Sequence, residues 1–279
     1  MSSGLLTGYY EGVKWVRGVV GFGMFALKVY LYLVDDILVD TGPSRLSRKF
    51  TGFFKEENID TVLLTHYHED HTGNAPYLAH KGIPHYINTK TVEVCRKEAV
   101  MPGYRRLYWG KRSSFPARPL SELLEGNSLD LEAIETPGHC ADQITYYFPE
   151  RGIVFTGDLF VTPKPKIILR SENVLQTIED LENVLSRDFD TVMCGHAGVV
   201  QEGRALMKRK LDYLVNLKGE VLHLHRKGWT AGEIRKKMYP RPTFLECFSG
   251  GEWSPSHLVN SIIHGELVEG ESPVKRISL

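Results

Sequence analysis

Five side chains able to bind a metal lie within six positions of the stretch "THYHEDHTGN", residues 65–74. They are His66, His68, Glu69, Asp70 and His71. Such groups must be hydrated, paired or bound when they are crowded together, and a cation would satisfy all of them at once. Imidazole and carboxylate are the zinc and iron ligands of catalytic sites, whereas structural zinc sites rely on cysteine. Because the sequence has no cysteine cluster, the stretch predicts a catalytic metal site rather than a solvated histidine-rich loop.

Four short apolar runs end in a residue of this kind. His66 follows "TVLL", His139 follows "ETPG", Asp158 follows "VFTG" and His196 follows "VMCG". A rigid strand that ends in a loop is where a scaffold delivers functional side chains. We therefore expect these four residues to meet in one site.

The elements that must position them read as strands mixed with helices. Apolar, β-branched runs bounded by Gly, Pro, Asp or Asn recur along the first 200 residues, and "VYLYLVDDILVDTG" (29–42) predicts two strands joined by a tight turn at Asp35 and Asp36. Between the runs, "ENVLQTIEDLENVLSR" (172–187) has apolar residues at three- and four-residue steps, which indicates an amphipathic helix. This mixture favours an α/β sandwich over an all-β fold.

From about residue 205 the pattern becomes helical. A long amphipathic helix is expected first, then a helix with a capping box between Thr230 and Glu233, then one with Ser254 as N-cap and Pro255 at its first position. We predict a catalytic domain over residues 1–204 and a helical C-terminal module over 205–279, packed on or near the active-site cleft.

The composition excludes some classes of partner. The chain has 279 residues and balances 34 Lys and Arg against 34 Asp and Glu, so it lacks the broad basic surface typical of proteins that bind nucleic acid or anionic membranes. The apolar stretch 18–27 has no small-residue cleavage site and stops at Lys28, so we expect neither export nor a membrane anchor. The widely spaced cysteines are expected to be reduced, in a cytoplasmic protein. They are Cys95, Cys140, Cys194 and Cys247.

The motifs "THYHEDHTGN", "TPGH", "FTGD" and "CGH", in this order, resemble the metallo-β-lactamase-fold superfamily, and in particular its glyoxalase II-type and β-lactamase-like protein 2 branches. The segment "ILVDTG", with Asp40 and Gly42, resembles the early strand and turn of the same superfamily. The similarity covers roughly residues 25–200. It implies an α/β fold with a four-layer αββα sandwich and a small helical C-terminal module.

The resemblance also implies a ligand set for two divalent metal ions, with Zn²⁺ expected and Mn²⁺ or Fe²⁺ left open. The first metal would bind His66, His68 and His139, the second would bind Asp70, His71 and His196, and Asp158 would bridge them. Asp40 would accept the other ring hydrogen of a ligand histidine, although a turn-capping carboxylate is an equally good interpretation.

The implied function is a metal-dependent hydrolase that uses a hydroxide held by both metals, with Asp70 and Asp158 as catalytic residues. The expected substrate is a small ester, thioester or lactone-like molecule. A single-stranded RNA nuclease and a mononuclear iron persulfide dioxygenase remain as alternatives. The sequence departs from the lactonase pattern, which has a tyrosine where Val161 stands, and from glyoxalase II in the "AGVVQEG" that follows His196.

The segment 103–118 concentrates basic and aromatic residues, which would suit an anionic substrate or single-stranded nucleic acid. A solvated insertion that covers one rim of the cleft is the favoured interpretation. Arg105 and Arg106 in this segment, and Lys164 on the other side, are the candidate substrate-binding residues. Glu69 is expected to face solvent.

Overall fold

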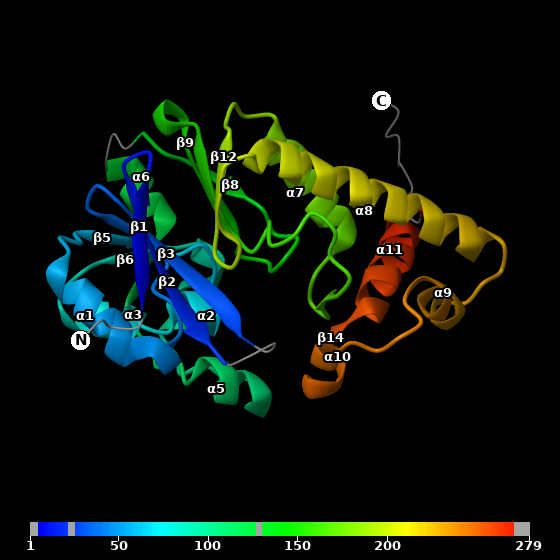
Figure 1. Cartoon of the computed structure of the whole chain (residues 1–279), viewed down its shortest axis with the longest axis horizontal. Helices are drawn as coiled ribbons and strands as arrows, with labels where there is room; N and C mark the ends of the chain where they lie inside the picture. The colour runs from blue at the N-terminus through cyan, green and yellow to red at the C-terminus, as the bar shows by residue number, and fades with distance from the viewer. Residues whose placement is uncertain (1–4, 22–25, 127–129, 271–279) are drawn as a thin grey trace, which may run out of the picture.

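Two β-sheets form the centre of the protein in the computed structural model, which describes residues 5–21, 26–126 and 130–270 (Figure 1). The first sheet has the order β1 (Leu6–Tyr10), β2 (Val13–Val20), β3 (Leu27–Val34), β4 (Ile37–Val39), β5 (Thr61–Leu63), β6 (His85–Ile87) and β7 (Ala117–Pro119). The second has the order β13 (Gly198–Val200), β12 (Thr191–Cys194), β10 (Ile153–Gly157), β9 (Ile144–Phe148) and β8 (Glu132–Glu135). A small third sheet pairs β11 (Ile168–Leu169) with β14 (Trp253–Ser254).

The two strands expected around Asp35 and Asp36 are present. Residues 29–34 are buried without interruption, which explains why this part of β3 is apolar throughout rather than alternating. Asp35 has φ 54, a left-handed conformation that Asp tolerates better than most residues, and the chain reverses there into β4. The apolar stretch that precedes Lys28 supplies the end of β2; residues 22–25 lie outside the described residues.

Parallel pairing brings the predicted site residues to one edge of each sheet. In the first sheet β4, β5, β6 and β7 run parallel, so the ends of β4 and β5 deliver Asp40 and His66 side by side. In the second sheet β10 pairs parallel to β12; Asp158 follows β10 directly, and His196 lies two residues after the end of β12. The backbone N–H of Gly195 donates to the carbonyl of Gly157 at 3.1 Å, which fixes the two strand ends to each other.

Helices cover the outer face of each sheet. They are α1 (Ser47–Glu56), α2 (Glu69–Thr72), α3 (Ala75–His80), α4 (Val92–Cys95), α5 (Gly103–Trp109), α6 (Leu120–Gly126), α7 (Val174–Leu185), α8 (Gly203–Arg226), α9 (Ala231–Met238), α10 (Phe244–Phe248) and α11 (Pro255–Gly270). Short 3-10 turns cover Ser44–Leu46, Thr89–Thr91 and Pro149–Arg151.

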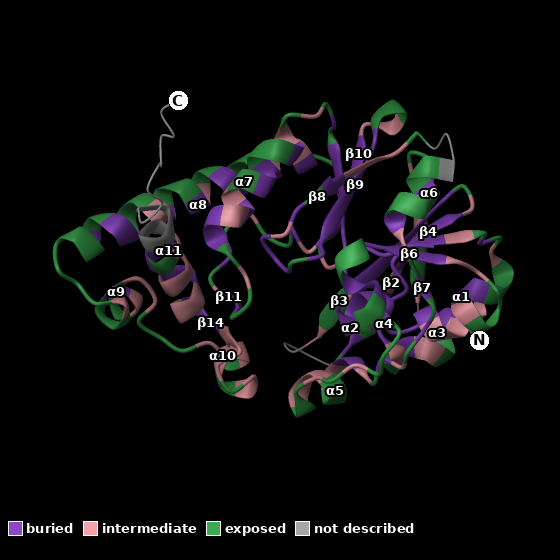
Figure 2. Ribbon diagram, turned by 180° about the vertical axis from the view of Figure 1, so that it is seen from behind, coloured by how far each residue is buried: buried purple, intermediate pink, exposed green. Residues whose placement is uncertain are grey.

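Three apolar clusters hold the layers together, and Figure 2 shows that most strands of the two sheets are buried. One lies between the sheets, where the Tyr32 and Phe155 rings meet at 5.4 Å. A second packs Phe50 of α1 onto the first sheet, and a third packs Leu181 of α7 and Met207 of α8 onto the second. Helix, sheet, sheet and helix therefore stack in the expected four-layer αββα order.

The C-terminal helices lie where the sequence predicts them. α8 begins at Gly203, close to the expected boundary, and α9 has the capping box of Thr230 and Glu233. α11 begins at Pro255, and the Ser254 hydroxyl accepts from the N–H of Ser256 at 3.1 Å. Because α8 and α11 share an apolar cluster with the second sheet, they pack against that sheet. None of the helices in the described ranges is both long and apolar enough to cross a membrane.

Candidate metal centre

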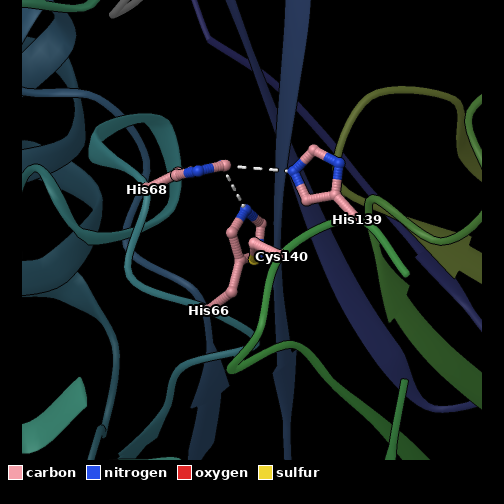
Figure 3. A group of neighbouring side chains, drawn as sticks. All are labelled: His66, His68, His139 and Cys140. Atoms are coloured by element: carbon pink, nitrogen blue, oxygen red, sulfur yellow. Dashed lines mark hydrogen bonds between the residues drawn. The ribbon is translucent and has the colours of Figure 1, made fainter. Parts of the chain in front are cut away.

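Three imidazole rings from distant parts of the chain converge in the first half of the site (Figure 3). His66 Nε2 lies 3.1 Å from His68 Nδ1, and His139 Nε2 lies 3.1 Å from the same atom. Three lone-pair nitrogens that share one small space are the donor set a divalent transition metal takes. Figure 3 also shows Cys140 beside them, but its thiol donates to Asp142 at 3.3 Å.

Two buried carboxylates hold the loops that carry these rings. Asp142 accepts from the backbone N–H of Tyr67 at 3.0 Å, between the ligand candidates His66 and His68. Asp180, on α7, accepts from the N–H of Gly138 at 2.6 Å, one residue before His139. Each loop is thus anchored by its backbone, so the rings are placed before any ligand arrives.

A second group lies beside the first. Asp70 Oδ2 is 3.2 Å from His196 Nε2 and 4.0 Å from His71 Nε2. Together with Asp158, one ligand atom from each of these residues lies within 4.8 Å of every other. The segment after β5 therefore supplies ligands to both groups: His66 and His68 face the first, and Asp70 and His71, at the start of α2, face the second.

Asp158 lies between the two groups. Its Oδ1 is 3.4 Å from His71 Nε2 and 3.5 Å from His196 Nε2, and its Oδ2 is 3.6 Å from His139 Nε2. One carboxylate thus directs one oxygen to each group. This is the position that the sequence analysis gives to a bridging ligand.

The buried polar atoms of the site fit a pair of cations. His71 Nε2 and Asp158 Oδ1 have no hydrogen-bond partner among the described residues, although burial of an unpartnered polar atom is costly. Both atoms point into the space that the two groups enclose. The donor set of imidazoles and carboxylates, without a thiolate aimed at it, matches zinc, manganese or iron.

The pKa shifts of the histidines in the site also favour a bound cation. Burial, together with the neighbouring histidines, keeps the pKa values of His66 and His68 well below the usual range, so both rings stay neutral with lone pairs free for a metal. Burial also opposes charge on His71 and His196, yet the nearby carboxylates raise the pKa of both. The site therefore attracts positive charge next to Asp158, which a bound cation would provide.

Asp40 connects the turn after β4 to one of the candidate ligand histidines. One of its oxygens accepts from the backbone N–H of Thr65 at 2.8 Å, and the other is 2.7 Å from His71 Nδ1. Because a carboxylate only accepts, the His71 proton sits on Nδ1 and Nε2 is left free to bind a metal. Asp40 has φ 60 and is 3% exposed, so it both adopts the left-handed conformation of the turn and contacts the His71 ring.

The expectation that Glu69 faces solvent is wrong. Its side chain is 7% exposed and forms a two-point ion pair with Arg105, with Nε to Oε1 at 2.5 Å and Nη2 to Oε2 at 2.9 Å. The local pattern does not reveal this, because Arg105 comes from α5, 36 positions away. The guanidinium of Arg105 is therefore already paired within the protein.

The other two candidate substrate-binding residues lie elsewhere. Arg106 lines a basic hollow of about 540 Å³ formed by residues 44–49, 106, 110 and 111, and Lys164 is exposed after the loop that carries Asp158. The structure does not bring Arg106 into the metal site. In the same insertion Arg112 is buried and donates to the carbonyls of Val94, Cys95 and Lys97, which makes it part of the core rather than a surface for nucleic acid.

Three residues near the site carry no signal in the sequence. The Trp109 ring lies 6.0 Å from the His196 ring, Glu172 Oε1 lies 3.6 Å from His139 Nδ1, and the buried Lys210 donates to the carbonyl of Leu159, next to Asp158. Each comes from a segment far from its partner in sequence. Only the packing of α5, α7 and α8 against the strand ends brings them there.

The chain is similar in sequence and in fold to known proteins. A family model for the metallo-beta-lactamase superfamily matches residues 26–196. The probable metallo-hydrolase YybB of Bacillus subtilis is 29% identical over 171 residues, 59% of this chain and 76% of its own. The beta-lactamase-like protein 2 homolog of Drosophila melanogaster is 25% identical over 198 residues, 64% of this chain and 59% of its own.

A thioesterase is also similar. The atrochrysone carboxyl ACP thioesterase of Aspergillus fumigatus is 24% identical over 212 residues, 71% of this chain and 60% of its own, so the chain spans less than two thirds of the fly and Aspergillus proteins. Among solved structures, a metallo-beta-lactamase family protein of Thermus thermophilus superposes with a TM-score of 0.64 at 16% identity, covering 94% of each chain. This likeness shows the shared fold.

Proposed function

Because the chain belongs to the metallo-β-lactamase superfamily, we propose that it is a metal-dependent hydrolase. It would cleave a small ester, thioester or lactone-like substrate with two divalent ions, zinc in the native protein. His66, His68 and His139 would hold one ion, Asp70, His71 and His196 would hold the other, and Asp158 would be shared. The observation that carries the proposal is the position of Asp158, with one oxygen toward each group.

Two bound divalent ions supply Lewis acidity, which lowers the pKa of water from ~15.7 toward ~7 and polarises a substrate carbonyl. The chain's own residues do the rest. Asp70 and Asp158 accept hydrogen bonds and orient the attacking water, and Asp40 holds His71 in its binding tautomer. The Trp109 ring beside His196 excludes bulk water on one side.

The substrate class rests on two supports. The Aspergillus relative is named a thioesterase, and the cations of the insertion are largely committed: Arg105 pairs with Glu69, Arg112 donates to backbone carbonyls, and Lys111 pairs with Glu98 at 2.7 Å. A nuclease needs free cations along several phosphates. A small neutral or weakly charged substrate is therefore favoured over RNA.

The metal content and a hydrolysis assay test the proposal. We expect close to two zinc ions per chain in protein purified without added metal, and turnover of an aryl ester, a thiolactone or an acyl thioester that stops when the ions are removed. One iron per chain, together with oxygen uptake on a persulfide, would identify the protein as a dioxygenase instead of a hydrolase. Cleavage of single-stranded RNA without turnover of any ester would replace it with the nuclease.

Two expectations from the sequence complete the proposal. We place the protein in the cytoplasm, because Cys95, Cys140 and Cys194 are buried and all four cysteines are unpaired. We also treat residues 1–204 as the catalytic domain and 205–279 as a module that shapes the cleft.

A further inference from the structure

Arg105 joins two segments that are far apart in sequence. Besides its two-point pair with Glu69, its Nη1 lies 3.3 Å from Oε1 of Glu252 in the C-terminal module. Glu69 stands between the ligand candidates His68 and Asp70, at the start of α2. One guanidinium therefore connects the metal-binding segment to the module.

This network is shielded from water. The side chains of Arg105 and Glu69 are 14% and 7% exposed, and that of Glu252 is 25% exposed. The planar guanidinium remains charged at all physiological pH values and matches a carboxylate at two points. Removing either charge from the buried pair would leave the other uncompensated, which is strongly unfavourable.

Aromatic contacts reinforce the same junction. The ring of Phe248, in α10, lies 5.6 Å from that of Tyr104 and 6.3 Å from that of Tyr108, both in α5. Figures 1 and 2 show α5 and α10 as the two elements that approach each other from opposite sides of the molecule. Segment 103–118 and the C-terminal module thus contact each other through α5 and α10.

The other side of the module is tied to the Asp158 side of the metal centre. β14 pairs with β11, and the N–H of Arg170 donates to the carbonyl of Glu252 at 3.0 Å. β11 is the first strand after Asp158 along the chain. Glu252 is consequently held from two directions: its side chain contacts Arg105, which pairs with Glu69 of α2, and its backbone binds the residue that follows β11.

We propose that Arg105 is a positioning residue that fastens segment 244–254 against the metal-binding helix, and that this fastened segment is the wall that selects the acyl group of the substrate. The inference rests on the proposed hydrolase, because selection is measured with its substrates. Arg105 would affect how the substrate fits by holding Glu252 in place, and it would not contact the substrate itself.

Glu252→Gln is the sharpest variant, since it removes one charge from the junction and leaves the buried Glu69–Arg105 pair intact. Glu57→Gln is the matched control. Glu57 pairs with Lys14 at 2.5 Å with side-chain exposures of 16% and 20%, similar to those of the junction, but neither residue belongs to α5 or to the C-terminal module. Both variants are expected to keep the metal content of the wild type.

Hydrogen exchange of the peptide 103–109 tests the fastening without any substrate. In Glu252→Gln we expect α5 to exchange faster by about fivefold or more, because its partner segment is released. In Glu57→Gln the same peptide should exchange as in the wild type. Unchanged exchange of α5 in Glu252→Gln would overturn the proposal.

The ratio of kcat/KM for octanoyl and acetyl thioesters of N-acetylcysteamine tests whether segment 244–254 selects the acyl group. We expect it to change by about fivefold or more in Glu252→Gln and to stay within about twofold in Glu57→Gln. Faster exchange with an unchanged kcat/KM ratio would show that segment 244–254 does not select the acyl group. If the wild type hydrolyses neither thioester, the proposed thioester activity fails and the selecting wall fails with it, while the exchange result still decides the fastening.

Discussion

The tautomer of one ligand histidine depends on a single carboxylate. Asp40 binds His71 Nδ1 at 2.7 Å from a left-handed backbone position. Asn can adopt the same backbone conformation, so Asp40→Asn preserves the turn and removes the negative charge. We expect metal affinity of the second group to fall by about 10- to 100-fold. Titration with a metal-sensitive dye measures it, and an unchanged affinity would mean that Asp40 acts on the turn alone.

His85 gives the protein a pH dependence that is separate from the metal site. It lies in β6, is completely buried, and burial lowers its pKa to about 4 from 6.5. Between these values the unfolded chain binds a proton that the folded chain does not, so stability is lost as pH falls from about 6.5 to about 4. The full loss is about 3 kcal/mol.

His85→Leu is expected to remove this part of the acid sensitivity. Urea unfolding of metal-free protein at pH 7 and pH 4.5 measures it: the variant should lose less stability between the two values than the wild type does. The exposed His80→Gln should behave as the wild type. A variant with the same loss as the wild type would assign the acid sensitivity to other groups.

At the scale of elements, the turn between β12 and β13 needs a residue without a side chain. A Cβ at Gly195 would lie 2.6 Å from His71 Cε1. Because Asp40 binds the same ring at Nδ1, His71 can avoid this Cβ only by giving up its present position. Gly195→Ala should therefore displace His71 and reduce the metal content from two ions toward one per chain, as measured by elemental analysis.

Gly219→Ala is the matched control for this substitution. Gly219 lies in α8 with nothing within 4 Å of its hypothetical Cβ, so the change should leave the metal content intact and stabilise the helix by about 1 kcal/mol. If Gly195→Ala also keeps two ions, the turn is more adaptable than its contacts indicate.

At the scale of the whole molecule, the metal centre joins the two sheets. Its residues come from the ends of β5, β8, β10 and β12, and three of its carboxylates are largely withdrawn from water. Ions that bind only the folded chain stabilise it by about 2.7 kcal/mol at a hundred times their Kd. A chelator should lower the Tm by several degrees, and added zinc should restore it.

Asp158→Asn provides the comparison for the chelator experiment. With the shared carboxylate neutralised, the variant should retain fewer ions and show a smaller Tm shift on chelation. An equal shift in both proteins would locate the stabilising ions outside the described cluster.

The charge of the whole molecule leads to a prediction about salt. Each neutralised phosphate makes nucleic-acid affinity fall more steeply with salt, and a small-substrate hydrolase makes few such contacts. We expect kcat/KM on an aryl ester to vary little between low and moderate salt. RNA cleavage that collapses over the same range and disappears in Arg106→Glu would instead indicate a nuclease.

The sequence by itself determined the α/β class and the ligand candidates, because these follow from short-range patterns and from motifs that resemble a known family. Apolar, β-branched runs indicate the strands, and the spacing of His66, His68, Asp70 and His71 is a local property of one turn. Parallel pairing aligns strand ends within each sheet, but only the packing of the two sheets brings both sets of ends together. The surroundings of those ligands required the tertiary structure. Glu69 is buried only because Arg105, from another helix, neutralises it, and Arg105 reaches Glu252 only because α5 meets α10. Such partners are chosen by packing between distant segments, for which one sequence carries no local signal.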